Sequence, residues 1–342
     1  MRTIPLGTTG LTVSEAGFGC IPIIRLSMGE AGKVLRHAYE RGITFYDTAR
    51  MYLDSEEKIG KALGDVRQKI VLATKTTQRR GAEAMADLET SLRQLGTDWV
   101  DLYQLHQLSE PEDVEVALGP GGVLEAVQKA KAQGKVRHIG FSCHSLEMAR
   151  KLAATGLFET VQFPFNLVET EASTTLHPEA SAKGMGILVM KPFAGGALDD
   201  GPLCLRYIRQ FPGLLVLPGF DSVEYVDQVA DLYDAPSAFS AQDEARAAAF
   251  RAELGSRFCR RCGYCQPCPN GVSITNAMMY GVLAKRLSPA KAVAFARETM
   301  ESVRQCIACG ECLDRCPYHL PIPDMLAELL GMFDRHCAEC RA

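Results

Sequence analysis

Eight of the thirteen cysteines in this chain of 342 residues lie in two short runs toward its C-terminal end. The first run has two residues between successive cysteines and ends in Cys-Pro: Cys259, Cys262, Cys265 and Cys268. The second run differs by one extra residue before its last cysteine: Cys306, Cys309, Cys312 and Cys316. Such short spacings let one tight loop hold three corners of an iron–sulfur cube, and the Cys-Pro ending is typical of 4Fe–4S ligation.

The two runs together predict two 4Fe–4S clusters. In two-cluster proteins the last cysteine of each run usually ligates the cluster of the other run. Because the first run has two residues rather than three before Cys268, the sequence leaves the ligand role of that cysteine open. Structural zinc is the main alternative. It is disfavoured because zinc needs two Cys-x2-Cys pairs, not two quartets that each end in Cys-Pro.

Four polar residues upstream could form a second reactive site. Asp47, Lys75 and His106 each end a run with the composition of a β-strand, and Tyr52 follows shortly after Asp47. Each alone has a structural explanation, such as Asp47 capping the next helix. Their occurrence at three successive strand ends predicts that they converge on one site.

The elements that would position these residues alternate through the first two thirds of the chain. Eight strands are predicted, at 16–20, 43–47, 70–75, 100–106, 136–142, 160–163, 186–191 and 214–218. Predicted helices between them include 29–41, 82–95, 122–133, 145–154 and 223–233. Eight strand–helix units over roughly 250 residues predict an α/β fold, a (β/α)8 TIM barrel with its site at the C-terminal ends of the strands. An open doubly wound sheet is disfavoured because no Gly-x-Gly-x-x-Gly follows the first strand.

The pattern changes after the eighth unit, which predicts three segments: a barrel over 1–235, a connector helix over 236–255 and an iron–sulfur domain over 256–342. The two cysteine runs are separated by more residues than the two runs of a minimal ferredoxin. This separation predicts a small, mostly helical ferredoxin-like domain with two helical stretches within 273–304.

Composition excludes several other classes of protein. Hydrophobic residues make up 47% and charged residues 23%, as in ordinary globular proteins. The formal net charge of −4 gives no basic field for nucleic acid, and no apolar run is long enough for a membrane span. No signal peptide is expected from the opening residues, and many thiols without a secretion signal predict a cytoplasmic location.

Residues 1–235 resemble the aldo/keto reductase superfamily. The matching motifs, besides Lys75, are Leu6-Gly7-x2-Gly10-Leu11-x-Val13-Ser14, Gly42-Ile43-x-Phe45-Tyr46-Asp47-Thr48-Ala49-x2-Tyr52, Asp101-Leu102-x3-His106, Gly134-Lys135-Val136-Arg137-x-Ile139-Gly140-Phe141-Ser142 and Gln162-x3-Asn166. With its cysteine runs, the chain is similar to the subgroup whose barrel is fused to a 4Fe–4S ferredoxin-type domain. The resemblance implies an NAD(P)-dependent oxidoreductase that reduces a small-molecule aldehyde or ketone, or oxidises the alcohol.

The resemblance also implies a catalytic tetrad of Asp47, Tyr52, Lys75 and His106. Carbonyl reduction needs a hydride from nicotinamide and a proton on the oxygen, and Tyr52 is the expected proton donor. A free tyrosine has a pKa of about 10, so the Lys75 cation is expected to favour the phenolate. Asp47 is expected to hold Lys75, and His106 to orient and polarise the carbonyl.

The expected cofactor is NADP or NAD. The predicted cofactor-binding residues are Ser142, Gln162, Lys191, Pro218, Gly219, Ser222 and Gln228. In the family, the first two positions hold the nicotinamide carboxamide, and the segment around Gly219 leads into a helix whose N-terminus favours the pyrophosphate. The basic residues that usually grip a 2′-phosphate are missing from this segment. Three carboxylates that should repel a phosphate stand there instead, so neither cofactor is preferred: Asp221, Glu224 and Asp227.

Two smaller motifs have a reactive and a structural interpretation. Cys143-His144 could be a nucleophile pair, but loop packing is favoured. His336-Cys337-x2-Cys340 could hold a further metal, but an untethered tail with incidental thiols is favoured.

The sequence does not decide what the clusters do, because a hydride carries two electrons whereas a 4Fe–4S cluster transfers one. No flavin fingerprint is present. Three interpretations follow: a carbonyl reductase with clusters of unproven role, an electron-transfer module that docks a flavoprotein or ferredoxin redox partner, or a nicotinamide- or oxygen-sensing binding protein. The intact tetrad favours the first. Substrate choice is expected to lie in the loops at 21–27, 107–120 and 166–177, and the acidic residues of the last two loops disfavour a highly anionic substrate.

Overall fold

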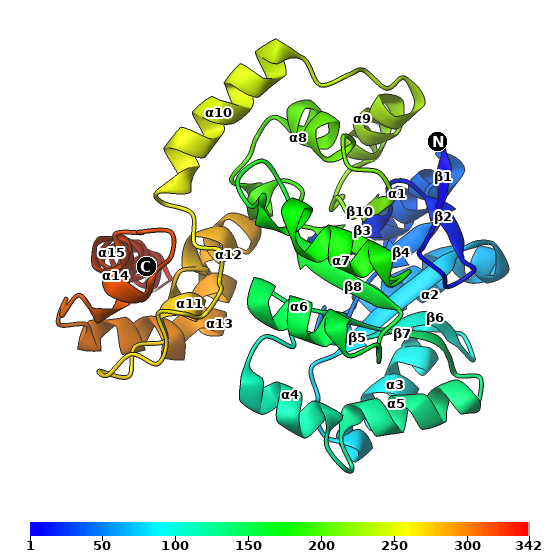
Figure 1. Ribbon diagram of the computed structural model, residues 1–342, viewed down its shortest axis with the longest axis horizontal. Coiled ribbons are helices and arrows are strands. Elements are labelled where there is room, and N and C mark those ends of the chain that lie inside the picture. The colour runs from blue at the N-terminus through cyan, green and yellow to red at the C-terminus, as the bar shows by residue number, and fades with distance from the viewer. Residues whose placement is uncertain (341–342) are drawn as a thin grey trace. The chain divides into compact units, whose positions relative to one another are not determined.

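The computed structural model describes residues 1–340, apart from the side chain of Arg286. The chain divides into two compact units (Figure 1). The first contains Met1–Ala194 and Asp200–Ser240, and the second contains Gly195–Asp199 and the chain from Ala241 onward. The first holds the strands, and the second is built of helices and loops.

An eight-stranded parallel sheet forms the centre of the first unit. In sequence order its strands are β3 (Phe18–Gly19), β4 (Phe45–Asp47), β5 (Val71–Thr76), β6 (Val100–Leu105), β7 (Val136–Ser142), β8 (Thr160–Pro164), β9 (Gly186–Met190) and β10 (Leu214–Val216). Bridges from Ala16 to Val216 and from Gly19 to Gly219 join the first strand to the last. The sheet therefore closes on itself, which confirms the predicted (β/α)8 barrel.

Helices connect the strands and surround the sheet (Figure 1). They are α1 (Met28–Glu40), α2 (Ser55–Leu63), α3 (Gly81–Leu95), α4 (Pro111–Leu118), α5 (Val123–Ala132), α6 (Leu146–Ala154), α7 (Leu176–Ala182), α8 (Gly201–Ile208) and α9 (Val223–Asp234). Short 3-10 turns are η1 (Pro22–Arg25), η2 (Gly64–Lys69), η3 (Glu171–Thr174), η4 (Ala194–Gly196) and η5 (Val303–Gln305). The start of α1 shows how sequence fixes a boundary. The Ser27 hydroxyl accepts the Glu30 N–H, and the Glu30 carboxylate accepts the Ser27 N–H.

An N-terminal hairpin that the sequence analysis did not predict precedes the barrel. Its strands β1 (Thr3–Pro5) and β2 (Thr12–Ser14) pair antiparallel. Leu6 and Val13 pack in one buried cluster with side chains of the barrel strands, including Phe45 and Leu102. Gly7 is required beside this hairpin, because a Cβ there would lie 2.3 Å from the backbone nitrogen of Gly186.

The second unit contains α10 (Ala241–Gly255), α11 (Ile274–Ala277), α12 (Tyr280–Arg286), α13 (Pro289–Ser302), α14 (Glu311–Arg315) and α15 (Ile322–Glu339). Three helices rather than the predicted two lie between the cysteine runs. The expected untethered tail is also wrong, because α15 extends through it. Phe333 is fully buried in the core of this unit, and the Tyr280 hydroxyl lies 2.8 Å from His336 Nδ1.

Among the described residues, none of the helices combines the length and the apolar character that a membrane span requires.

His177 in α7 gives the barrel a predictable acid sensitivity. Its ring packs edge-on against Phe165 at a centroid distance of 4.8 Å, and both ring nitrogens are buried without a hydrogen-bond partner. Burial lowers the pKa of His177 from 6.5 to about 4. Between these two pKa values the unfolded chain binds a proton at His177 that the folded protein does not bind. The free energy of unfolding therefore decreases as the pH falls from about 6.5 toward about 4.

We expect His177→Phe to remove this contribution, which is at most about 3 kcal/mol at the acid end. Denaturant unfolding of wild type and variant at pH 7.5 and at pH 4.5 measures it. The variant should lose less stability on acidification than wild type, whereas a variant of the exposed His319 should behave as wild type does. Equal losses in wild type and His177→Phe would contradict this assignment.

Candidate active site and candidate cluster-binding loops

Three adjacent strands bring the predicted tetrad together at the C-terminal end of the barrel. Asp47 is the last residue of β4, Lys75 lies at the end of β5, and His106 directly follows β6. The parallel register aligns Lys75 with Gln104 on β6, which sets these side chains side by side. Tyr52 lies in the turn between β4 and α2.

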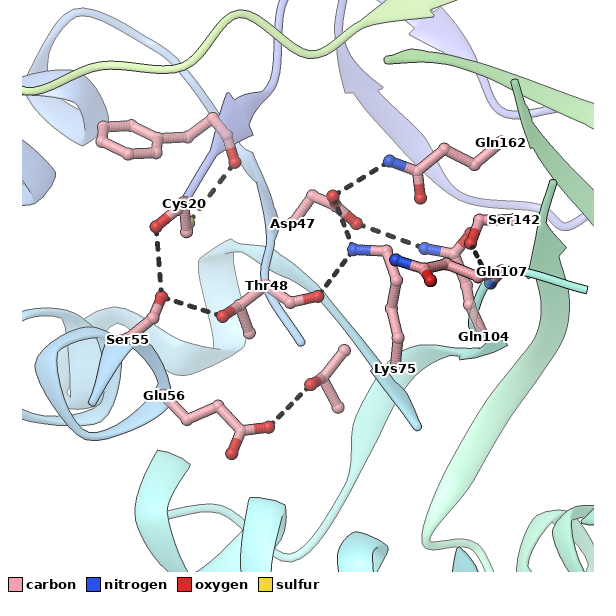
Figure 2. Close-up of polar contacts among 12 residues, drawn as sticks. Cys20, Asp47, Thr48, Ser55, Glu56, Lys75, Gln104, Gln107, Ser142 and Gln162 are labelled. Atoms are coloured by element: carbon pink, nitrogen blue, oxygen red, sulfur yellow. Dashed lines mark hydrogen bonds and ion pairs between the residues drawn. The ribbon is translucent and has the colours of Figure 1, made fainter. Parts of the chain in front are cut away.

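Lys75 is at the centre of the polar contacts (Figure 2). Its Nζ donates to Asp47 Oδ2 at 2.7 Å and to the Thr48 carbonyl oxygen at 2.7 Å. Only 1% of Lys75 and 4% of Asp47 are exposed. A charge pair this deeply buried is hard to separate, because loss of either partner would leave an uncompensated charge in the core.

The two aromatic members of the tetrad lie next to this ion pair. Lys75 Nζ is 5.3 Å from the centroid of the Tyr52 ring. The rings of Tyr52 and His106 meet edge to face, with centroids 5.8 Å apart. Tyr52 is half-buried and His106 is buried. The structure thus brings together all four residues that the sequence analysis singled out.

The backbone beside these residues is held in an uncommon conformation. Leu53, directly after Tyr52, has φ of 47°, and Gln107, directly after His106, has φ of 56°. Lys191, a predicted cofactor-binding residue at the end of β9, has φ of 55°. Non-glycine residues rarely adopt this left-handed region, and such strain clusters at functional sites.

Two glutamines also contact Asp47 (Figure 2). Gln104 Nε2 donates to Asp47 Oδ1 at 3.2 Å, and Gln162 Nε2 donates to Asp47 Oδ2 at 3.1 Å. The Oε1 atoms of both glutamines are buried without a hydrogen-bond partner. Gln104 was not predicted as a site residue, although strand alternation places it on the same face of the chain as His106, two residues later.

The segment after β7 contains Ser142 and the candidate nucleophile Cys143. Ser142 Oγ accepts the backbone N–H of Gln107 at 2.9 Å. Cys143 is buried, and its Sγ donates to the Ser145 carbonyl oxygen at 3.2 Å. Burial raises the pKa of Cys143 to about 11, which favours loop packing over a nucleophilic role.

The predicted phosphate-binding segment lies between β10 and α9. The Pro218 carbonyl accepts the Gly19 N–H at 2.8 Å. A Cβ on Gly219 would lie 2.7 Å from Pro22 Cγ, so glycine lets η1 approach this segment. Ser222 caps α9 by accepting the Tyr225 N–H at 3.3 Å, and Gln228 is exposed one turn and a half further on.

Basic residues from distant parts of the chain reach this segment. Arg25 of η1 forms an ion pair with Asp221, with Nη2 and Oδ2 2.6 Å apart. Asp227 pairs with His37 and Arg41 of α1. The expectation that only carboxylates stand near this segment is therefore wrong, because two of the three are paired with cations.

The two cysteine loops of the second unit have the same backbone turn around their second cysteine. In the first, the residues on either side of Cys262 have positive φ, 61° at Arg261 and 85° at Gly263. In the second, Ala308 and Gly310 flank Cys309 with φ of 52° and 88°. The same turn therefore recurs in both runs.

Each loop lines its own cavity together with one cysteine of the other run. One cavity is lined by four cysteines: Cys259, Cys262, Cys265 and Cys316. The other is lined by Cys268, Cys306, Cys309 and Cys312, and Cys265 borders it as well. Cys268 thus lies with the second run and Cys316 with the first, the crossed arrangement that suits two 4Fe–4S clusters.

The chemistry of these thiols also fits such a group. Burial, followed by the charges of Cys259 and Cys262, raises the pKa of Cys265 to about 12. Burial likewise raises the pKa of Cys312. Several thiolates can share such a cavity only with positive charge between them, which the iron ions of a cluster supply. In the part of the chain that the structure describes, no three His, Cys, Asp or Glu side chains form a site for a single metal ion.

Comparison with known families agrees with this geometry. A model described as the aldo/keto reductase family matches residues 4–203, and one described as a 4Fe-4S dicluster domain matches residues 258–320. Because the first match covers more than half of the chain, this protein belongs to the aldo/keto reductase family. It carries a 4Fe–4S dicluster domain after the reductase barrel.

Solved aldo-keto reductases share the fold. The enzyme from Klebsiella pneumoniae, determined in complex with NADPH, is 25% identical with a TM-score of 0.64, over 73% of this chain and 95% of that one. The Bacillus halodurans protein is 24% identical with a TM-score of 0.63, over 73% and 96%. The Brucella melitensis protein is 23% identical with a TM-score of 0.59, over 73% and 99%. The last two are evidence for the fold alone.

Proposed function

We propose that this protein is an NAD(P)H-dependent oxidoreductase that reduces an aldehyde or ketone to the alcohol, or catalyses the reverse oxidation. One observation carries the proposal: a buried Lys75–Asp47 ion pair lies beside the Tyr52 ring, whose edge meets His106. A phenol, a cation and an imidazole at one barrel mouth are what proton delivery to a carbonyl oxygen requires.

The proposed roles follow from charge. When bound, the reduced nicotinamide supplies the hydride. Tyr52 donates the proton to the carbonyl oxygen, and the Lys75 cation stabilises the phenolate that remains. Asp47 keeps Lys75 in place, and Gln104 and Gln162 hold Asp47 by donating to its two oxygens. His106 orients the carbonyl and stabilises the charge that develops on its oxygen.

The nucleotide is proposed to lie between β7 and α9. Gln162 Oε1, a buried acceptor without a partner, suits an N–H of the nicotinamide carboxamide, and the Ser142 hydroxyl suits its oxygen. Pro218, Gly219 and Ser222 lead into the N-terminus of α9, which favours the pyrophosphate. Lys191 and Gln228 complete the proposed set. The NADPH bound to the Klebsiella relative supports a nucleotide of this kind.

Arg25 is expected to favour NADPH over NADH. A 2′-phosphate at this end of the site would replace Asp221 as its partner and form a charge-assisted hydrogen bond. Because both side chains are about one-third exposed, we expect Arg25→Gln to weaken NADPH binding by only about fivefold, roughly 1 kcal/mol. Asp221→Asn, which frees Arg25, should strengthen NADPH binding.

Titration of nucleotide binding by calorimetry measures both effects. NADH binding should change little in either variant, and Arg36→Gln, which breaks a surface pair with Asp65, is the matched control. Equal weakening of NADH and NADPH by Arg25→Gln would refute this role.

We propose that the second unit holds two 4Fe–4S clusters. The cluster of the first run is bound by Cys259, Cys262, Cys265 and Cys316. The cluster of the second run is bound by Cys306, Cys309, Cys312 and Cys268. A second function, one-electron exchange with an external flavoprotein or ferredoxin, is favoured by the exposure of Cys309, which would leave an edge of the second cluster near solvent.

The reductase function is tested by anaerobic turnover of a panel of aldehydes and ketones with NADPH and with NADH. Oxidation of the nucleotide that depends on the carbonyl is the expected result. Binding of nucleotide without carbonyl-dependent oxidation across the panel would exclude the reductase and favour the electron-transfer function.

A further inference from the structure

The end of α15 contains a histidine and two cysteines within five residues: His336, Cys337 and Cys340. The structure supports neither of the two interpretations that the sequence analysis considered for them. The helix continues through Glu339, so this segment is not an untethered tail. Within the described residues, no three His, Cys, Asp or Glu side chains are placed to hold a metal ion. The two thiols, which lie outside both cysteine runs, therefore need another explanation.

Helical geometry brings these two thiols to one side of α15. The Cys340 N–H donates to the His336 carbonyl oxygen at 3.1 Å, and Cys340 keeps a right-handed helical backbone with φ of −74° and ψ of −11°. Cys337 and Cys340 are thus three residues apart on a continuous helical turn, which makes their side chains neighbours. Cα atoms at this spacing are about 5 Å apart, within the range that a disulfide bridges.

Contacts with α12 hold this end of the helix in place. The Tyr280 hydroxyl lies 2.8 Å from His336 Nδ1, and the Tyr280 ring meets Phe333 edge to face with centroids 5.5 Å apart. Burial, followed by the charges of Cys337 and Cys340, raises the pKa of Tyr280 to about 12, so both thiols lie within electrostatic reach of one hydroxyl. A helix end held in this way frays less, which keeps the two thiols in register.

The two thiols differ in exposure as a stepwise exchange requires. Cys340 is exposed, so a small molecule can reach its sulfur. Cys337 is half-buried and packs against the core of the second unit. The accessible thiol can therefore react first with an external molecule, and the shielded thiol can attack the product from the preceding turn.

We propose that Cys337 and Cys340 form a redox-active dithiol that exchanges with a low-molecular-weight disulfide. The Cys340 thiolate attacks one sulfur of the external disulfide, which forms a mixed disulfide and releases the other half as a thiolate. The Cys337 thiolate then attacks the Cys340 sulfur and releases the second half. The two protein thiols are oxidised to one disulfide, the external disulfide is reduced to two thiols, and the two protons of the protein thiols pass to the released thiolates.

Equilibration of the full-length holoprotein with mixtures of glutathione and glutathione disulfide, in the absence of oxygen, tests this exchange. After acid quenching and alkylation, trypsin releases these two cysteines and no others in one peptide, because it cleaves after Arg335 and Arg341. Mass spectrometry should show this peptide without alkyl groups and two hydrogens lighter. Its oxidised share should rise from one-tenth to nine-tenths over an about 80-fold increase in the ratio of disulfide to squared thiol concentration. A pair that stays reduced throughout, or that stops at the mixed disulfide, would overturn the proposal.

Three variants identify the step that each thiol performs. Cys337→Ser should stop at the mixed disulfide on Cys340, and Cys340→Ser should leave the half-buried Cys337 reduced in the same mixtures. Ala338→Ser, an exposed position between the two thiols, is the matched control and should follow wild type. Oxidation of Cys337 to the wild-type extent in Cys340→Ser, or a disulfide that links two chains, would contradict the pair. The mass of this peptide depends neither on cluster content nor on carbonyl turnover, so the result is independent of the proposed function.

Discussion

Tyr52→Phe is expected to lower carbonyl turnover by about 10²–10⁴-fold, the usual contribution of a general acid, while the fold stays intact. The substitution removes one oxygen from a half-buried ring and keeps the ring contacts with Lys75 and His106. Nucleotide affinity should change little, because the phenol acts on the substrate oxygen. The loss should therefore appear in kcat, in steady-state assays of NADPH oxidation.

Tyr39→Phe is the matched control for this experiment. Tyr39 is half-buried near the end of α1, at the opposite end of a strand–helix unit from Tyr52, and its variant should turn over like wild type. Circular dichroism and thermal unfolding should be the same for both variants. Undiminished turnover by Tyr52→Phe would remove this residue from the mechanism.

Cys268→Ala is expected to remove or destabilise the cluster of the second run and to leave that of the first. Cys268 lines the cavity of Cys306, Cys309 and Cys312, so its loss leaves that cluster with three protein ligands. Purified anaerobically, the variant should retain about half of the iron and sulfide of wild type, with the signal of one cluster in EPR.

Two further variants sharpen this result. Cys316→Ala should produce the mirror effect on the cluster of the first run. Cys340→Ala removes an exposed thiol outside both runs and should keep the full iron content. If Cys268→Ala also kept full iron and an unchanged spectrum, the crossed arrangement would be wrong.

The barrel was predictable because each strand–helix unit has a clear local signal. The five predicted helices begin and end within two residues of α1, α3, α5, α6 and α9. The N-terminal hairpin was missed because its strands are only three residues long, and their burial comes from the barrel above them. The expected untethered tail was wrong because Leu326, Leu330 and Phe333 have helical spacing and pack on the core of the second unit, so this periodicity and not the thiols near it determines the structure at the end of the chain.

The residues of the candidate site that follow strands could be predicted from the sequence. Contacts between residues that are distant in the sequence could not. Asp47, Lys75 and His106 could be found because a barrel places all strand ends on one face. Arg25 is 196 residues from Asp221, and no spacing rule relates η1 to the segment before α9. The partner of Cys268 likewise depends on how the helices between the two runs bring the loops together.

The most direct test of the reductase follows the hydride itself. The holoprotein is incubated anaerobically with aromatic and aliphatic aldehydes and NADPH deuterated at both C4 positions, and the products are analysed by mass spectrometry. We predict deuterium on the carbinol carbon of at least one alcohol, and at least about 100-fold less of this product with Tyr52→Phe over the same time. Bound nucleotide with no deuterated alcohol from any aldehyde would contradict the assignment of this protein as a carbonyl reductase.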